Sequence, residues 1–513
     1  MKTFPFQRHD PQEGGAQYLE DLATAYWFSE VIFTAVELDV FSMLDPAGST
    51  AARIAQMMEF DTPAVERFLE ALCALGLATR GNGGSFYNSR IAAQYLVKGK
   101  ECYQGNSIQW RKTISSPWKS LKDSLKSGGR VYYPAPEKTM ERLQRYISAM
   151  DDVARVKSRD IGALFRDISG RILDVGAGSG AVAAEFLDRF SGTKATLIDL
   201  PDVLNYAARL MDQRELAERI TFCPANILEP WPVGKGMFDL VVLSNVLHAY
   251  GQTEAIHLLG QARECLNAGG LLVIHDFFQE HCPEKAAVFD LNMLINTYNG
   301  KVFSAKWVRR HLQSKSLTVS GLLPLDSDTG LIVAAGKAEC LARLCLDPVS
   351  LLLARMKDLG FRSARSIDVD SVHVADWAGQ RCQFGCSEYG RPRCPPNSPS
   401  ADETRKVLKD YSRALLLEGE PPTGSFHLKA LKAEKEAFAA GFYKSFIYWA
   451  GPCSICKQGC PDNGVCRNTR QARPSMESAG IDVFKTVRRA GFSLRPLRNK
   501  DDYVKYFALL LLE

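Results

Sequence analysis

The sequence predicts an α/β protein with a helical N-terminal domain, a central doubly wound parallel sheet, and a C-terminal α+β domain rich in cysteine. Three observations support this fold class. A chain of 513 residues is too long for one hydrophobic core. A strand, a glycine loop and a helix follow one another at 171–190, as in the first unit of a doubly wound sheet. Seven of the fourteen cysteines stand in two clusters between residues 382 and 466.

Five segments are expected from the shifts in composition. They are a dimerisation domain at 1–105, a helical linker or substrate cover at 106–168, the sheet domain at 169–338, a linker at 339–348, and the cysteine-rich domain at 349–513.

Composition narrows the class of protein. Hydrophobic residues make up 46% of the chain and charged residues 24%, as in soluble globular proteins. The net charge of +5 is small for this length and does not indicate a nucleic-acid partner. We find no secretory signal and no apolar run long enough to span a bilayer. Single cysteines scattered through apolar segments suggest a reduced, cytoplasmic protein.

The first hundred residues predict a winged helix. Ser49-Thr50 caps a helix at 51–58, and Asp61-Thr62 with Pro63 begins a second helix that runs to Leu75. Residues 77–79 and 86–87, joined by a glycine-rich tip, form the hairpin wing. A DNA-reading helix needs Arg, Lys, Asn or Gln, whereas this second helix is apolar and roughly neutral. We therefore expect a packing or dimerisation module, with DNA binding as the weaker alternative.

The glycine loop predicts a nucleotide-like ligand. A strand at 171–175 leads into Asp174-Val-Gly176-Ala-Gly178-Ser-Gly180, where glycines allow close approach of a ligand to the backbone. The next strand ends in Asp199, which is placed to accept hydrogen bonds from ribose hydroxyls. The spacing of the glycines also matches the fingerprint of dinucleotide-binding loops, so NAD is an alternative ligand. Asp174 favours S-adenosylmethionine (SAM), because a carboxylate there suits an ammonium group and would repel a pyrophosphate.

Residues 17–338 resemble the O-methyltransferases that pair a winged-helix dimerisation domain with a Rossmann-like catalytic domain. The resemblance rests on the order of several motifs, which are Glu37–Phe41, the glycine loop, Asp199-Leu200-Pro201, Asn226 before an apolar pair, Leu243–His248, and Gly269-Gly270 through Asp276-Phe277. It implies a homodimer, with His248 as the general base and Asp276 as its partner. The cofactor-binding residues that we expect are Asp174, Gly176, Gly178, Gly180, Asp199, Leu200, Asn226, Ile227 and Ser244.

The chain departs from this pattern at four positions. Ala249 follows the histidine where an aspartate is frequent, Ser244 replaces a cofactor lysine, and Asn226 replaces an acid. Val302 stands where a second glutamate supports the histidine. These changes leave open a more acidic hydroxyl or a carbon atom as the methyl acceptor. From the resemblance, we expect the acceptor to contact the helix at 286–296 (Phe289, Asn292, Met293, Asn296) and the turn to Trp307.

The clustered cysteines predict a metal site. They form two groups, Cys382, Cys386 and Cys394, and Cys453, Cys456, Cys460 and Cys466. Only Cys453 and Cys456 form the pair spacing typical of zinc, whereas the second group has spacings like those of ferredoxins. We expect a [4Fe–4S] cluster, with zinc as the alternative. Residues 349–513 also resemble a family of predicted metal-binding proteins, through Cys382…Tyr389-Gly390…Cys394-Pro-Pro and Arg473–Glu477.

Together these features predict a SAM-dependent methyltransferase acting on a small aromatic or lipophilic acceptor, by O- or C-methylation. The metal domain would couple the reaction to an electron donor or sense redox state. The alternative is an electron-transfer or metal-sensing protein with a degenerate methyltransferase scaffold.

Overall fold

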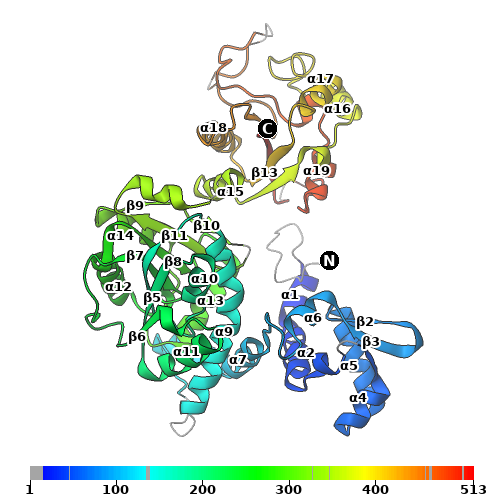
Figure 1. Cartoon of the computed structure of the whole chain (residues 1–513). Helices are drawn as coiled ribbons and strands as arrows, with labels where there is room; N and C mark the ends of the chain where they lie inside the picture. Colours follow the sequence, from blue (N-terminus) through cyan, green and yellow to red (C-terminus); the bar gives the residue numbers. More distant parts are fainter. Residues whose placement is uncertain are drawn as a thin grey trace. The chain divides into compact units, whose positions relative to one another are not determined.

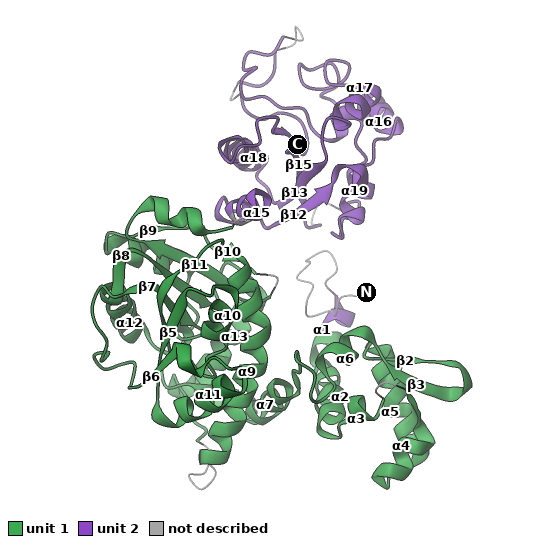
Figure 2. Ribbon diagram, in the orientation of Figure 1, with its two compact units in different colours: residues 1–7, 19–345 green, residues 8–18, 346–513 purple. Residues whose placement is uncertain are grey.

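The described residues of the computed structural model divide into two compact units, one within residues 19–345 and one within residues 347–513 together with residues 15–18 (Figure 2). The structure describes residues 15–44, 47–133, 139–325, 327–345, 347–456, 458–461, 465–499 and 502–513, except for the side chains of Thr139 and Ala354. Within those residues, no helix is both long and apolar enough to cross a membrane.

The N-terminal domain has the predicted order of helix, helix and hairpin (Figure 1). The side chain of Thr50 accepts a hydrogen bond from the Arg53 amide at 3.3 Å, and Asp61 accepts one from the Ala64 amide at 2.9 Å, so the two expected caps are present. A short strand also joins the hairpin, giving the antiparallel order β1-β3-β2. The elements are α1 (Ala16–Ala23), α2 (Tyr26–Glu37), α3 (Val40–Met43), β1 (Ser49–Thr50), α4 (Ala51–Met58), α5 (Thr62–Ala74), β2 (Ala78–Arg80), β3 (Ser85–Asn88) and α6 (Arg90–Tyr95).

Helices connect this domain to the sheet. They are α7 (Gly105–Ser115), α8 (Leu121–Ser127) and α9 (Thr139–Ala163). Trp110 and Ile114 of α7 pack against Ala149 of α9 in a small buried cluster. The long helix α9 also packs against α10 of the sheet domain, so the linker is part of the same unit as the sheet.

The central sheet has the strand order β10-β11-β8-β7-β4-β5-β6, with β9 paired to β11. Five strands are parallel and β11 is antiparallel to β8. The strands are β4 (Gly170–Val175), β5 (Thr193–Asp199), β6 (Ile220–Pro224), β7 (Phe238–Ser244), β8 (Leu266–Asp276), β9 (Thr318–Val319), β10 (Leu323–Pro324) and β11 (Gly330–Ala335). The helices are α10 (Ala181–Arg189), α11 (Pro201–Gln213), α12 (Gln252–Cys265), α13 (Pro283–Asn296) and α14 (Ala305–Ser314).

The parallel register positions the functional residues. Because β4, β5, β7 and β8 run in one direction, their carboxyl ends meet at one edge of the sheet. Ligands of open α/β sheets bind outside that edge. Val175, Asp199, Ser244 and Asp276 end these four strands, so the loops that follow them face a common space.

The C-terminal unit contains a four-stranded antiparallel sheet in the order β12-β13-β15-β14. The sequence predicts helices at 349–359, 401–410 and 428–440 and a closing strand at 503–512, and all four are present, but it does not predict the other three strands. Its elements are α15 (Pro348–Asp358), β12 (Ser363–Asp368), α16 (Trp377–Gly385), α17 (Ala401–Leu408), β13 (Arg413–Gly419), α18 (Thr423–Ala439), β14 (Phe446–Tyr448), α19 (Val483–Arg489) and β15 (Tyr506–Leu511).

Both faces of this sheet are buried. Leu415, Leu417 and Leu510 belong to one hydrophobic cluster, whereas Leu416 and Leu509 belong to another. An antiparallel sheet commonly exposes one face and shows alternation in sequence. The strand was not predicted because the apolar run at 414–417 lacks that alternation.

We expect Leu510→Ala to lower the free energy of unfolding of the C-terminal unit by about 2–5 kcal/mol, because it leaves a cavity in a fully buried strand. Urea denaturation followed by circular dichroism would measure the shift. Leu428→Ala is the matched control, since Leu428 is exposed and its loss should cost under about 0.5 kcal/mol. Equal shifts for both variants would contradict the packing described above.

Candidate functional site

The glycine loop follows β4 at the carboxyl edge of the central sheet. Gly176, Gly178 and Gly180 all have positive φ, at 65°, 57° and 77°. A Cβ on Gly176 would lie 2.8 Å from Cγ2 of Val246, so a side chain there would clash. A Cβ on Gly178 would meet nothing within 4 Å, so the loop borders open space at that point. This is the space that a cofactor needs to approach the backbone.

Two carboxylates flank the loop. Asp174 Oδ2 accepts a hydrogen bond from the Ala183 amide at 3.2 Å. The Oδ2 and Oδ1 atoms of Asp199 accept hydrogen bonds from the amides of Gly178 and Leu200, each at 2.8 Å. Burial, opposed by the Ala183 hydrogen bond and reinforced by the charge of Asp199, raises the pKa of Asp174 to about 7. A cationic ligand group beside Asp174 would relieve this cost of burying a negative charge.

The other predicted cofactor residues surround the same loop. Ile227 is buried, and its Cδ1 lies 3.6 Å from the position that a Cβ on Gly176 would take. Leu200 is exposed at the start of α11. Asn226 Oδ1 accepts a hydrogen bond from the Leu228 amide at 3.1 Å, so it shapes its own turn. Ser244 Oγ lies 2.8 Å from His275 Nδ1.

His275 is a site residue that the sequence analysis missed. It stands on β8 and bridges Ser244 to the Thr329 hydroxyl, with its Nε2 at 2.8 Å from Thr329 Oγ1. Burial and the nearby Lys157 lower the pKa of His275 to about 3, so the ring is neutral. Its position inside an apolar strand gave no signal of this bridge in the sequence.

The structure brings His248 and Asp276 together. His248 Nδ1 lies 2.5 Å from Asp276 Oδ1, and the His248 amide donates to Asp276 Oδ2 at 3.2 Å. The side chain of Asp276 is 3% exposed and that of His248 is 14% exposed. Among the described residues, no hydrogen-bond donor or acceptor is paired with His248 Nε2. A proton on Nδ1 shared with Asp276 leaves Nε2 as the basic nitrogen.

Aromatic rings surround His248. The rings of Phe277 and Phe289 stack at 3.8 Å between centroids, and the imidazole meets them edge-on at 5.7 and 5.1 Å. Lys157 Nζ lies 5.2 Å from the centre of the Phe277 ring. Val302, at the position of the expected second glutamate, is fully buried with Phe277 and Phe289. Asp276 is therefore the carboxylate that contacts the imidazole.

Lys157 is a second residue that sequence reasoning missed. It projects from α9 and forms a 2.9 Å ion pair with Asp328, far away in the sequence. A lysine on an amphipathic helix normally indicates a solvated face, so only the packing of α9 against the sheet domain reveals this position.

The predicted acceptor helix is α13, and its residues have different surroundings. Asn292 is buried, and its Oδ1 accepts hydrogen bonds from Trp118 Nε1 at 3.2 Å and from Asn296 Nδ2 at 3.0 Å. Met293 is buried, and Phe289 contacts His248. Trp307, which was expected near the acceptor, stacks on Phe303 at 4.7 Å beside the main hydrophobic core.

The C-terminal unit holds the seven clustered cysteines. Among the described residues, no disulfide joins these seven cysteines. Cys382 lies on α16 and Cys386 directly follows that helix. Arg391 donates a hydrogen bond to the Cys460 carbonyl at 3.0 Å, which joins the segments that carry the two cysteine groups.

Burial and neighbouring thiols raise the pKa of thiols in both groups. Burial and then neighbouring charges raise the pKa of the Cys394 thiol to about 12; those neighbours are Cys386, Glu388, Cys382 and Cys460. Burial raises the pKa of Cys453 as well, with further contributions from Cys460, Cys456 and Cys466. Crowded thiolates repel one another, and a bound cation would relieve that repulsion. The donor set therefore fits a soft metal.

The structure does not assemble a finished metal site. Within the described residues, no three cysteine, histidine or carboxylate side chains converge in a geometry that could hold a metal ion. The grouping of thiols is thus observed, whereas their spacing does not determine which of them share a metal.

Comparison with known families matches three parts of the chain. Residues 20–98 match the O-methyltransferase dimerisation domain, residues 118–315 match the O-methyltransferase domain, and residues 365–512 match a family described as predicted metal-binding protein (DUF2284). Among curated proteins, 3-hydroxy-5-methyl-1-naphthoate 3-O-methyltransferase of Streptomyces sahachiroi is 28% identical over 57% of this chain and 87% of its own length. The chain is a SAM-dependent methyltransferase.

Other similarities agree with this assignment. Acetylserotonin O-methyltransferase of Bos taurus is 29% identical to this chain, over 56% of this chain and 88% of its own length. Two solved structures share the fold with a TM-score of 0.55 each. One is an O-methyltransferase family protein from Burkholderia thailandensis, 22% identical over 63% of this chain and 99% of its own. The other is human N-acetylserotonin methyltransferase in complex with SAM, which is 23% identical over 64% of this chain and 100% of its own.

We expect SAM to bind the methyltransferase more tightly as the pH rises from 6 to 8. Asp174 has a raised pKa of about 7, so below that pH it must lose a proton before it can pair with the ammonium group of SAM. The affinity should fall by up to about tenfold per pH unit below 7. Calorimetric titration in buffers of different ionisation enthalpy would detect the released proton.

Asp174→Asn should weaken SAM binding and remove most of this pH dependence. Asp188→Asn is the control, because Asp188 forms a surface ion pair with Arg214 on the same domain. An unchanged pH dependence in Asp174→Asn would show that another group controls cofactor binding.

Proposed function

We propose that the methyltransferase transfers a methyl group from SAM to a hydroxyl of a small aromatic acceptor, with His248 as the general base. One observation carries this proposal. His248 is held by Asp276 through Nδ1, while its Nε2 has no hydrogen bond to another described residue. This geometry leaves one ring nitrogen to accept the acceptor's hydroxyl proton beside an aromatic wall.

The proposed reaction is an in-line displacement. As His248 Nε2 takes the hydroxyl proton, the acceptor oxygen forms a bond to the methyl carbon and the carbon–sulfur bond of SAM breaks. The electron pair of that bond remains on sulfur, giving the neutral thioether S-adenosylhomocysteine. Asp276 stabilises the imidazolium that forms on His248. Alignment of oxygen and methyl group by the surrounding residues supplies much of the rate.

For the cofactor we propose specific roles. Asp174 receives the ammonium group, and Asp199 receives the ribose hydroxyls, while Gly176, Gly178 and Gly180 provide close backbone approach. Ile227, Leu200 and Asn226 border the adenine, and Ser244 contributes a hydroxyl held by His275. The open space at Gly178, the buried Asp174 and the half-buried Asp199 support this assignment.

The acceptor site favours an aromatic ring. Phe277 and Phe289 offer apolar faces, and Phe289 stands on α13 beside the buried Asn292. The relatives named above act, according to their names, on a hydroxynaphthoate and on acetylserotonin. Both names indicate aromatic acceptors, which supports an aromatic acceptor for this chain. We propose O-methylation over C-methylation because Nε2 is available as a base.

We infer that the N-terminal module is a winged helix used for homodimerisation. Leu19, Leu22, Tyr26 and Trp27 are large apolar side chains on α1 and α2 that are exposed in the single chain. A second copy of the chain would bury such a patch. On α5, Glu66 and Glu70 pair with Arg80 of the wing, so this helix has little free positive charge for nucleic acid.

For the C-terminal unit we propose an iron–sulfur cluster held by Cys453, Cys456, Cys460 and Cys466, with Cys382, Cys386 and Cys394 holding a second site. A cluster of this kind supplies or accepts single electrons. We propose that it relays electrons one at a time from an external electron donor, so that two electrons and two protons keep a redox-active acceptor as the quinol, since a quinone has no hydroxyl to methylate. Clustered cysteines without disulfides fit a reducing compartment such as the cytoplasm.

His248→Gln should lower kcat by about 10²–10⁴-fold while leaving the affinity for SAM unchanged. The loss should shrink for acceptors with more acidic hydroxyls, because these lose their proton without a strong base. Steady-state kinetics with a series of substituted phenols would measure both effects. His257→Gln is the control, because His257 is an exposed histidine on α12. A loss that is the same for every acceptor would argue against a base role.

The protein purified without oxygen should contain about four iron and four sulfide ions per chain, with a visible absorption band that dithionite bleaches. Metal analysis and absorption spectroscopy measure this. Cys456→Ser should lose the band, whereas Cys73→Ser, in the N-terminal domain, should keep it. Stoichiometric zinc without visible absorbance would contradict the proposed cluster. Equal rates of quinol methylation with and without the cluster would contradict its redox role.

A further inference from the structure

The C-terminal unit contains a cavity of about 370 Å³. It is lined by residues of α16, of the short turn at Glu477–Ala479, of α19 and of β15, together with the segment that precedes β15. All of these elements belong to the same unit. The volume falls within the range typical of small-molecule sites.

The walls of the cavity are mainly apolar and aromatic. Trp377 of α16, Phe484 of α19, and Tyr506 and Phe507 of β15 contribute rings. The remaining apolar lining residues are aliphatic side chains such as Ile481, Val483 and Leu494. Such walls favour a flat apolar molecule, because ring faces offer large contact areas with little loss of side-chain entropy.

Two arginines give the cavity a positive rim. Arg381 and Arg495 both line it and are both exposed. The guanidinium of Arg381 lies 5.9 Å from the centre of the Trp377 ring. Within the described part of the chain, neither arginine forms an ion pair with a carboxylate. Unpaired guanidinium groups at the mouth of an apolar cavity favour a ligand that carries a carboxylate or a similar anion.

Glu477 supplies a polar group on the cavity wall. Its Oε2 atom is buried and has no hydrogen-bond partner among the described residues, and the residue lines the cavity. Buried polar atoms normally have partners, so this oxygen is available to a polar group of a ligand in the cavity. A hydroxyl on the ligand would satisfy it.

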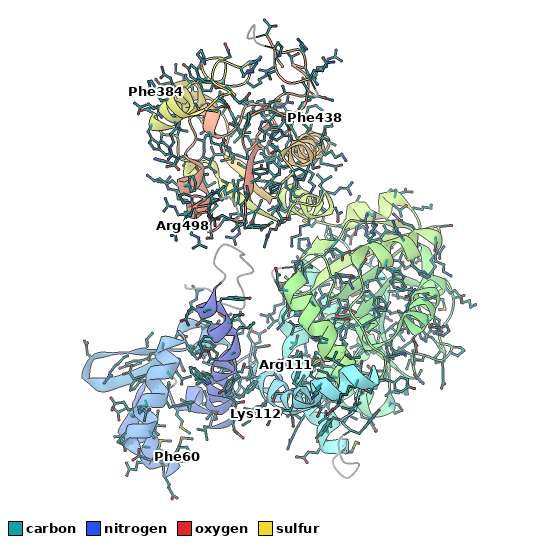
Figure 3. All side chains as sticks on the ribbon, turned by 180° about the vertical axis from the view of Figure 1, so that it is seen from behind. Phe60, Arg111, Lys112, Phe384, Phe438 and Arg498 are labelled. Carbon is teal, nitrogen blue, oxygen red and sulfur yellow. The ribbon has the colours of Figure 1, made fainter. Side chains whose placement is uncertain are left out.

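Cys382 and Cys386 also line the cavity. These thiols belong to the three-cysteine group, so a molecule in the cavity would lie against them. Phe384, between them in sequence, is labelled on α16 in Figure 3 and is 81% exposed, and it is not a lining residue. The two thiols therefore face the cavity, whereas the intervening ring lies outside it.

We propose that this cavity is a second ligand site, which binds a small hydroxylated aromatic anion independently of the methyl acceptor site. The aromatic body lies between Trp377 and Phe507, the anion pairs with Arg381 and Arg495, and the hydroxyl reaches Glu477. A bound molecule covers Cys382 and Cys386, so occupancy of the site and access to these thiols are linked.

Titration of the full chain with 6-hydroxy-2-naphthoate tests the proposal. The chain has seven tryptophans. The quenching of Trp377 is therefore obtained by subtracting the fluorescence quenching of the Trp377→Phe variant from that of the unmodified chain. The double variant Arg381→Gln, Arg495→Gln should weaken this site-specific quenching by about tenfold or more. Its binding of 2-naphthol, which lacks the carboxylate, should change little. Arg413→Gln is the control, because Arg413 is exposed on β13 and does not line the cavity.

A second readout does not depend on fluorescence. In chain treated with a chelator, 6-hydroxy-2-naphthoate should slow the alkylation of Cys382 and Cys386 by iodoacetamide, with Cys456 unaffected, as measured by peptide mass spectrometry. Unchanged affinity in the double arginine variant would overturn the proposal. Equal alkylation of Cys382 and Cys386 with and without the probe would overturn it as well.

Discussion

The parallel register of β7 and β8 is the constraint on which the candidate active site depends. Ser244 at the end of β7 lies opposite His275 on β8, so the residue after His275 meets the loop that follows β7. That residue is Asp276, and the loop carries His248. The 2.5 Å contact between the two side chains is therefore a consequence of strand pairing. The same edge gathers Asp199 and the glycine loop, because β4 pairs in parallel with both β5 and β7.

Much of this arrangement could be predicted from the sequence, because local chemistry determines it. The glycine spacing, the carboxylates Asp174 and Asp199, and the helix caps at Thr50 and Asp61 each act over a few residues. Other features depend on contacts between distant segments. Lys157 pairs with Asp328, and His275 bonds to Thr329, across separations that a single sequence does not reveal. The contact of the acceptor with the turn to Trp307 stays a prediction, because aromatic residues at helical spacing fit a core and a pocket equally well.

The C-terminal unit was harder to predict for a different reason. Its central strands are apolar on both faces, since Leu416 and Leu417 face separate clusters, and the usual alternation is missing. The cysteines were conspicuous in the sequence, and the hydrogen bond from Arg391 to the Cys460 carbonyl joins the segments that carry the two groups. The cavity beside Cys382 and Cys386 could not be predicted, because its walls come from segments that are about a hundred residues apart.

The most direct test of the proposed function uses SAM labelled with carbon-13 in its transferred methyl group. The acceptors are naphthols and hydroxynaphthoates, kept reduced, and carbon NMR identifies the atom that receives the label. Our account predicts a methyl ether as the product, with little or none formed by His248→Gln. Label on a ring carbon, or the same ether formed at the same rate by His248→Gln, would contradict the assignment of His248 as the base of an O-methyltransferase.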